Sequence, residues 1–348
     1  GPMKLEAMRS SNTHRHRQTS FLGEELCDGD QFTDEIAFED KTMIIERCPG
    51  NYLNIVDCHC SNVQDFIDEV RSLDLMTKDV KGTTPLIRGV LPIIPREWFD
   101  NPPESVSSEV VGIRLGDVLT HEPYRNNAGI LLINPDVGFD YSALKRPIFS
   151  GKKVVLVSTG PDTVIETLWF HRFSNEMFDV IARAGFYAVT GMNFSLFLHE
   201  CPLGHLINLN KSLLFCEELD KRGVPVIPHV YAINDKHRAM WASYLKEHPN
   251  IRSVLINTQM QRDYVSMKEV EATTQLLLDK TEVNVILNGY QPKEPSWGVN
   301  GRVIVSNQFN MKRAQIINKG IERQHAQMIE AVRIASTKPQ PRVVVSKT

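Results

Sequence analysis

One unit recurs between residues 128 and 307 of this chain. It is a short run rich in Val, Ile and Leu that stops on a small cluster of Asn, Asp, Gln, Ser or Thr and is usually followed by a helical pattern. Apolar runs of this length bounded by turn residues are typical of buried parallel strands. In parallel sheets the polar side chains at the carboxyl ends of the strands are where ligands bind. The repeat therefore predicts an α/β domain with one polar rim.

The number of these runs predicts the architecture. Eight is the number of strands that closes a (β/α) barrel, so we predict an α/β, (β/α) barrel-like domain over residues 87–335. An open doubly wound sheet is the alternative, because residues 95–127 are rich in Pro and residues 288–302 leave no room for a good helix. The candidate strands fall near residues 87–94, 129–134, 153–158, 186–191, 225–230, 252–257, 283–288 and 302–306.

Helical spacing of apolar residues fills the gaps between several of these strands. Ser174 is placed to cap a helix that carries Met177, Phe178 and Ile181 on one face. A second apolar stripe covers residues 209–219 and ends at Gly223. Two further helices are predicted over residues 236–247 and 266–279.

The remaining segments divide the chain further. Residues 1–34 are polar and predict a mobile arm. Residues 35–86 predict a small α+β element, with a hairpin and one amphipathic helix. Residues 336–348 form a basic tail.

Composition limits the possible partners. The 348 residues are 42% hydrophobic and carry a net charge of −3, which is typical of a globular protein and argues against nucleic-acid binding by the whole surface. Residues 311–348 hold eight basic and two acidic residues, so a nucleic-acid contact through this segment stays open beside a solvated helix face and tail. No apolar run approaches the roughly 20 residues needed to span a bilayer, and the start of the chain has no apolar signal core. We expect a cytoplasmic protein without a membrane contact.

The cysteines do not predict a metal site. Six cysteines in a chain of this length suggest a reducing compartment rather than a disulfide scaffold. Cys48, Cys58, His59 and Cys60 supply soft ligands, but they lack the paired C-x2–4-C spacing of structural zinc sites. Zinc is not expected, and the sequence assigns no cofactor.

Acid/base chemistry is concentrated at two strand ends. His229 and Asp235 bracket the end of the run 225–230, and an imidazole beside a carboxylate can act as a general base. Asp136 follows the run 129–134 in the turn Asn134-Pro135-Asp136. The alternatives are a core histidine and two ordinary turn or cap carboxylates. The candidate catalytic residues are His229, Asp235 and Asp136.

Amide and hydroxyl side chains recur along the same rim. Amides donate and accept together, so they suit uncharged polar ligands such as nucleobases and sugars, although Asn is also common in turns. The turn of residues 158–163 could bind an anion through its backbone N–H groups, with helix capping as the alternative. The candidate ligand-binding residues are Tyr231, Asn193, Asn257, Gln259, Asn288, Asn307, Thr159 and Asp162.

Two short patterns resemble a known family. Met192-Asn193-Phe194-Ser195-Leu196-Phe197 with Pro202 downstream, and Gly223-Val224-Pro225-Val226-Ile227-Pro228-His229-Val230, resemble a domain-of-unknown-function family of bacterial, phage and mobile-element proteins. The resemblance covers about residues 128–290. It implies a role in phage or mobile-element biology and supplies no activity or catalytic residue.

Two functions remain open. The first is an enzyme that acts on a polar small molecule such as a nucleoside, nucleotide or glycosyl compound, by acid/base or carboxylate chemistry typical of hydrolases and glycosyl-transferring enzymes. The second is a non-catalytic scaffold that binds a protein or nucleic-acid partner. The sequence contains no Ser-His-Asp elbow, H-E-x-x-H helix or G-x-G-x-x-G fingerprint that would decide between them.

Overall fold

The computed structural model describes residues 75, 78–102, 108–196, 202–259, 264–289, 292 and 294–308. The predicted arm of residues 1–34, most of the predicted α+β element of residues 35–86 and the cysteine group around His59 lie outside the described residues. The basic segment 311–348, with the tail 336–348, lies outside them too.

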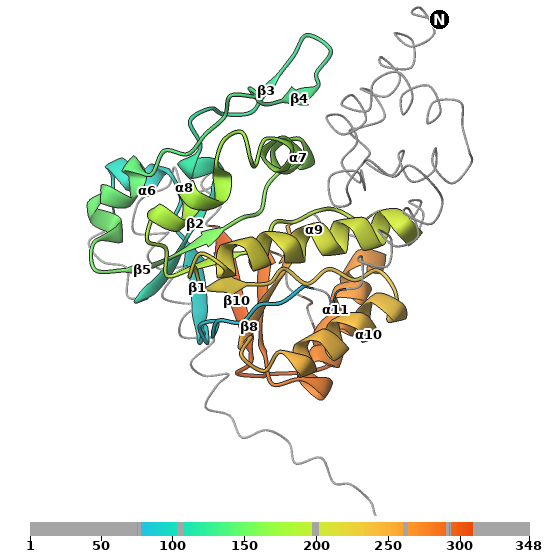
Figure 1. Ribbon diagram of the computed structural model, residues 1–348. Coiled ribbons are helices and arrows are strands. Elements are labelled where there is room, and N and C mark those ends of the chain that lie inside the picture. Colours follow the sequence, from blue (N-terminus) through green and yellow to red (C-terminus); the bar gives the residue numbers. More distant parts are fainter. Residues whose placement is uncertain are drawn as a thin grey trace, which may run out of the picture.

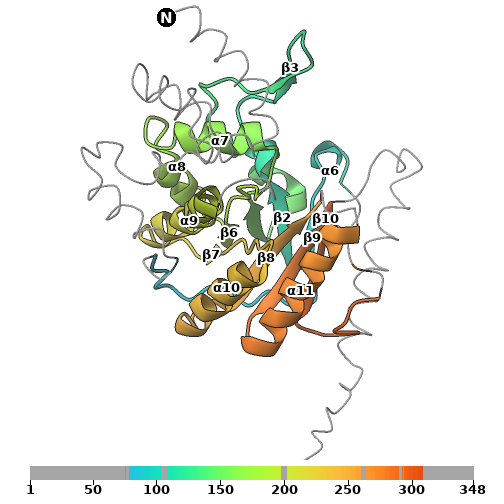
Figure 2. The same ribbon diagram turned by 90° about the vertical axis from the view of Figure 1, so that its right-hand side faces the viewer.

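Eight parallel strands form one sheet and follow one another round it in chain order (Figures 1 and 2). The predicted barrel-like α/β fold is therefore confirmed. Parallel strands need crossover connections, and most of these are helices packed outside the sheet. The strands are β1 Val90–Ile93, β2 Val110–Arg114, β5 Lys153–Val157, β6 Ala188–Thr190, β7 Val226–Ile227, β8 Ser253–Thr258, β9 Asn284–Gly289 and β10 Val303–Gln308.

The sheet curls round so that its first and last strands pair. β1 pairs with both β10 and β2, while β7 and β8 are joined by a single bridge between His229 and Leu255. Two backbone hydrogen bonds hold this bridge: Leu255 N–H to the Pro228 carbonyl at 2.9 Å and Val230 N–H to the Leu255 carbonyl at 2.8 Å. Following the paired residues from strand to strand once round the sheet leads back to β1 at a position eight residues from the starting residue. This offset is the shear number of a regular (β/α) barrel.

Successive side chains of each strand point alternately out of the barrel and into it, so the apolar residues form two cores. The larger core lies between the strands and the surrounding helices and includes Trp98, Trp169 and Trp241. The smaller one fills the barrel interior, and Gly112 belongs to its lining because a Cβ there would meet side chains of Ile93 and Val157. The interior residues are Ile87, Leu91, Ile93, Val155, Val157, Ala188, Ile227, Leu255, Ile286 and Ile304.

The helices agree with the predicted ones, with one correction. α9 is followed by Gly223 at φ 76°, as the apolar stripe predicted. The prediction that Ser174 caps a helix is wrong: α8 begins at Met177, Glu176 takes the N-cap position with φ 48°, and Ser174 Oγ instead donates to the His171 carbonyl. The helices are α6 Glu97–Asp100, α7 Asp162–Phe170, α8 Met177–Arg183, α9 Pro202–Asp220, α10 Asp235–Glu247 and α11 Tyr264–Lys280.

The second barrel strand was also misplaced. Residues 129–134 were predicted to form it, but they contain only β4 (Leu131–Leu132), which pairs antiparallel with β3 (Tyr124–Arg125) outside the barrel. Figure 1 shows this hairpin standing out from the same end of the molecule as α7. The real strand is β2, which lies inside the stretch 95–127. It was missed because Gly112 stands at its centre, and glycine weakens a strand pattern.

Among the described residues, no helix has both the length and the apolar character that a membrane crossing requires.

Gly191 fixes how closely the end of β6 approaches β7. A Cβ at this position would lie 2.8 Å from the backbone N of His229, so the backbone itself would have to move. We expect Gly191→Ala to lower the free energy of unfolding by about 1–3 kcal/mol through overpacking. Urea unfolding followed by circular dichroism measures the loss. Gly116→Ala is the matched control, since no atom lies within 4 Å of that added Cβ. Equal stabilities of the two variants would contradict this account of Gly191.

Candidate functional site

The barrel interior changes character at its carboxyl end. Continuing the inward alternation by one step from the apolar layer places five polar side chains there, each on a different strand or strand extension. Thr190, Asn288 and Ser306 are fully buried, His229 is almost so, and Asn257 is partly exposed. We call this set the mouth layer: Thr190, His229, Asn257, Asn288 and Ser306.

Hydrogen bonds join most of the mouth layer into a chain across β7 to β10. Ser306 Oγ donates to Asn288 Oδ1 at 3.5 Å, and Asn288 Nδ2 donates to Asn257 Oδ1 at 3.2 Å. The Asn257 backbone N–H donates to His229 Nε2 at 3.3 Å. Among the described residues, Asn257 Nδ2 has no hydrogen-bond partner, and the side chain is half-buried. This amide is therefore available to a ligand.

The opposite end of the barrel provides a contrast within the same strands. Ser253 and Asn284 also point inward, but the Ile87 N–H donates to Ser253 Oγ at 2.9 Å and Asn284 Nδ2 donates to the Ile87 carbonyl at 2.8 Å. These polar groups close the amino-terminal end by satisfying one backbone segment. Of the two polar layers, the one at the carboxyl end contains the donor without a partner among the described residues, Asn257 Nδ2.

His229 is held as a neutral imidazole. Burial lowers its pKa to about 4, and its Nε2 accepts a backbone N–H, so the proton of the neutral ring belongs on Nδ1. Among the described residues no carboxylate lies within hydrogen-bond distance of it. The geometry thus favours His229 as a neutral hydrogen-bonding group rather than as the general base that the sequence suggested.

The two predicted catalytic carboxylates lie away from His229. Asp235 is in the first turn of α10, its side chain is 99% exposed, and it pairs with Arg238 at 2.8 Å. Asp136 is an exposed turn residue whose backbone N–H donates to Asn134 Oδ1 at 2.8 Å. Because residues 129–134 are not a barrel strand, the premise that put Asp136 on the rim was wrong. The structure does not bring His229, Asp235 and Asp136 together.

Asn193 is one of the predicted ligand-binding residues, and it joins two loops of the chain. Its amide donates to the Gly160 carbonyl at 3.1 Å and accepts the Gly160 N–H at 2.9 Å. The neighbouring Ser158 N–H donates to Thr190 Oγ1 at 2.8 Å. Two N–H groups of the turn 158–163 are therefore already used, which argues against the anion site predicted there.

The other predicted binding residues vary in their access to the mouth. Thr159 is buried, and Gln259 is half-buried beside Gly289. The ring of Tyr231 lies 6.0 Å from that of His229 and is partly buried. The backbone of Asn307 pairs with Pro92 in the β1–β10 ladder, and its side chain lies outside the described residues.

A second polar group lies where the chain leaves β5 and β6. Ser195 Oγ donates to Asp162 Oδ1 at 2.6 Å, and one turn further along α7 Glu166 Oε2 accepts from Lys211 Nζ of α9 at 2.7 Å. The Lys211 side chain is fully buried, and its ammonium lies 4.7 Å from the centre of the Phe194 ring. We call Asp162, Glu166, Ser195 and Lys211 the buried charge cluster.

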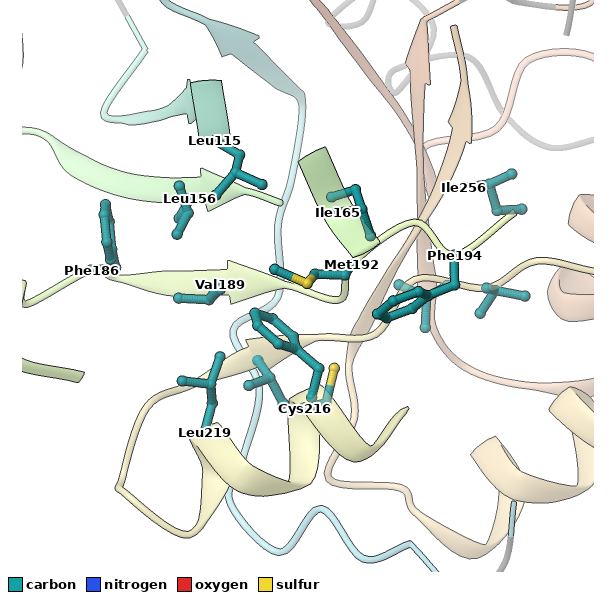
Figure 3. Packing of buried hydrophobic residues seen from close by; sticks show 14 of the residues in the cluster. Leu115, Leu156, Ile165, Phe186, Val189, Met192, Phe194, Cys216, Leu219 and Ile256 are labelled. Atoms are coloured by element: carbon teal, nitrogen blue, oxygen red, sulfur yellow. The ribbon is translucent and has the colours of Figure 1, made fainter. Parts of the chain in front are cut away.

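Apolar packing surrounds this cluster. Figure 3 shows Met192 and Phe194, which follow β6, gathered with Ile165 of α7 over the helix that carries Cys216 and Leu219. In this environment burial raises the pKa of Glu166 to about 7, against the lowering effect of the Lys211 charge. Burial also raises the pKa of Asp162, against the hydrogen bond from Ser195. A carboxyl group whose pKa lies near neutrality can donate and accept a proton, which is the property of a general acid/base.

Two buried polar atoms next to the cluster make no hydrogen bond with any described residue: the indole Nε1 of Trp169 and Oδ1 of Asn208. Asn208 is tied to the cluster because its Nδ2 donates to the Ser195 carbonyl at 2.7 Å. Buried polar groups are normally satisfied, so each of these atoms is an available partner for a small polar molecule.

Sequence reasoning missed several charged residues. Lys211 lies four residues from each of the buried Ile207 and Phe215, on the same face of the helix. A lysine within this apolar stripe could have predicted a buried charge. Arg96, Arg114 and Asp117 follow the ends of β1 and β2 and interact across the two strands. The misplacement of the second strand hid them.

A shallow groove on the outside of α11 is an alternative location. Its polar groups are used within the chain: the Ser296 N–H donates to Glu271, Ser296 Oγ to Gln275 and Gln275 Nε2 to Asp279. The groove therefore fastens the loop before β10 to α11, and the carboxyl end of the barrel is the better candidate.

Among the described residues, no three His, Cys, Asp or Glu side chains are grouped as a metal-ion site would require. No protein-family model matches the chain, and a search of curated proteins finds no significant match. The candidate site is therefore defined by its geometry.

Lys211 provides a test of the buried charge cluster. Since the folded-state pKa of Glu166 is raised from 4.5 to about 7, the stability associated with Glu166 is present below pH 4.5 and is lost as the pH rises through 7. In Lys211→Met, two buried carboxyl groups lose their cation and their pKa values rise further. We expect a loss of about 3–5 kcal/mol in unfolding free energy at pH 8 and about 1–2 kcal/mol at pH 5, where the Glu166 carboxyl can be protonated.

Urea unfolding of the wild type and the variant at the two pH values measures these losses. Lys221→Met is the control, because the Lys221 side chain is 59% exposed where it pairs with Glu217 and Glu218, and its loss should stay below about 1 kcal/mol at either pH. A Lys211→Met loss of the same size at pH 5 and pH 8 would contradict the charge coupling.

Proposed function

We propose that this protein is an enzyme that binds a polar small molecule of nucleoside, nucleotide or glycosyl type at the carboxyl-terminal mouth of its barrel. The observation that carries the proposal is the mouth layer. Between its two polar ends the barrel interior is apolar, and burying an amide without a partner costs about 1–3 kcal/mol. A chain of amides in which Asn257 Nδ2 has no partner among the described residues is the arrangement expected of a surface that recognises an uncharged polar ligand.

The chemistry is assigned to the buried charge cluster rather than to His229. Asp162 begins α7 after the turn that follows β5, and it accepts the hydroxyl hydrogen of Ser195 from the segment after β6. Asp162 is the candidate catalytic acid/base. Lys211 and Glu166 act as positioning residues: burial raises the pKa of Asp162 and the Lys211 charge lowers it, while Glu166 accepts a hydrogen bond from Lys211.

This assignment fits reactions in which a proton is moved to or from a leaving group, as in hydrolysis or glycosyl transfer. His229 and Asn257 would orient the ligand through hydrogen bonds that do not change between pH 5 and 8, because the imidazole stays neutral there. A role in phage or mobile-element biology rests on the family resemblance alone.

A scaffold function is the second candidate, and the β3–β4 hairpin favours it. The hairpin projects from the mouth end of the molecule, and Tyr124 on it is 53% exposed with the exposed Arg125 beside it (Figure 1). Exposed Tyr and Arg side chains are enriched in protein interfaces. The two functions differ in whether the mouth binds a small molecule.

The first experiment is mass spectrometry of small molecules released from the purified protein, followed by calorimetric titration with a panel of nucleosides, nucleotides and glycosides. For the compound that binds, we expect Asn257→Ala to weaken binding by about tenfold, which corresponds to about 1.4 kcal/mol from the lost hydrogen bonds. Asn284→Ala is the matched control, because it removes a buried amide from the other end of the barrel. It should lower stability and leave affinity unchanged.

Two results would count against the proposal. One is a purified protein that carries no small molecule and binds no member of the panel, which would favour the scaffold function. The other is equal weakening of binding by Asn257→Ala and Asn284→Ala, which would mean that the effect is on folding rather than on recognition.

A further inference from the structure

Two arginines stand together at the carboxyl ends of β1 and β2. Arg114 is the last residue of β2 and points to the same side as Gly112, which faces the barrel interior. Arg96 follows the end of β1 by three residues. Since the strands are parallel, both guanidinium groups lie at the mouth end of the barrel, the end that carries the mouth layer.

One buried carboxylate orients both arginines. Asp117 Oδ1 accepts from Arg96 Nε at 3.0 Å, and its two oxygens accept from Nε and Nη2 of Arg114 at 3.2 Å each. The Asp117 side chain is only 1% exposed, whereas those of Arg96 and Arg114 are 48% and 38% exposed. The guanidinium groups are therefore fixed from behind by Asp117 and keep an open side. Among the described residues, Nη1 of Arg114 makes no hydrogen bond.

A carboxylate of the chain already occupies part of that open side. Glu122, which is 69% exposed, pairs with Nη1 of Arg96. Exposed ion pairs contribute little to stability, so an external anion can replace this contact at little cost. Without Glu122, two guanidinium charges face one carboxylate, and the group carries an excess of one positive charge.

We propose that Arg96 and Arg114 form an oxyanion subsite, which binds the phosphate or carboxylate group of the small molecule held at the mouth. The inference rests on the proposed function and deepens it, because it makes the ligand an anion. Guanidinium groups whose orientation is fixed suit the paired acceptor oxygens of such groups.

The position of the subsite also limits the size of the ligand. β1 lies between β10, which carries Ser306 of the mouth layer, and β2, which carries Arg114. Neighbouring strands are about 4.8 Å apart, so Arg114 lies about 10 Å round the sheet from Ser306, at the near end of the mouth layer. A ligand that uses both sites must therefore extend across the mouth.

The test is calorimetric titration of the full-length protein with inorganic phosphate and, separately, with acetate. We expect Arg114→Gln to weaken binding of the preferred anion at least tenfold and Glu122→Gln to strengthen it about threefold or more. The Glu122→Gln variant separates an effect on binding from an effect on folding. Glu122 is exposed, and a misfolded variant would not bind the anion more strongly. Arg146→Gln is the control, because Arg146 is 50% exposed and paired with Asp100, and it should leave binding unchanged.

The two arms identify the anion: preference for phosphate indicates a phosphorylated ligand, and preference for acetate indicates a carboxylate. The subsite is refuted if neither anion binds, or if Arg114→Gln and Glu122→Gln bind as the wild type does. Failure of the proposed function is a separate result. If a nucleoside binds through Asn257 and Arg114→Gln has no effect, only the subsite is refuted. If phosphate binds through the arginines and no organic ligand binds, only the proposed function is refuted.

Discussion

The structure depends on how the barrel closes between β7 and β8. The segment Pro225-Val226-Ile227-Pro228 has prolines at two of its four positions, and proline cannot donate to a ladder. Pro228 still accepts the Leu255 N–H, but among the described residues the backbone ladder between the two strands consists of one bridge, at His229. In a continued parallel ladder the Asn257 N–H would bond to the Val230 carbonyl, and here it bonds to the His229 imidazole instead. A side chain thus completes the closure, and the same contact begins the mouth layer.

This closure explains why His229 is a poor base. An imidazole that accepts a ladder N–H in a buried position cannot take up a proton near neutrality without losing that bond, and burial alone lowers its pKa to about 4. The proton-transfer capacity at the mouth end lies instead with carboxyl groups whose pKa values are raised. In the proposed function, recognition lies on β7 to β10 and acid/base chemistry lies next to β5 and β6.

The sequence predicted the parts of the fold that depend on local pattern. β8 and β9 were found because each holds three successive branched apolar residues, 254–256 and 285–287, whereas β2 was missed because Gly112 interrupts its pattern. Asn257 and Asn288 were identified as rim residues because they end strands. The bond between Asn193 and Gly160 joins two loops, and Arg96, Arg114 and Asp117 meet across two strands. Such pairings depend on strand order and register, which residue types and spacing do not specify.

The buried charge cluster is the strongest argument that the mouth end has a chemical role. Burying Lys211 and Glu166 removes two charges from water, and replacing such a pair with apolar side chains of similar volume is often neutral or stabilising. Stability therefore does not account for the pair, and neither does packing, since Phe194 and Trp169 already fill its surroundings. Lys211 does, however, act on Asp162, because burial raises the pKa of that carboxyl and the Lys211 charge lowers it. We therefore take the buried charge cluster as support for the proposed enzyme rather than for the scaffold.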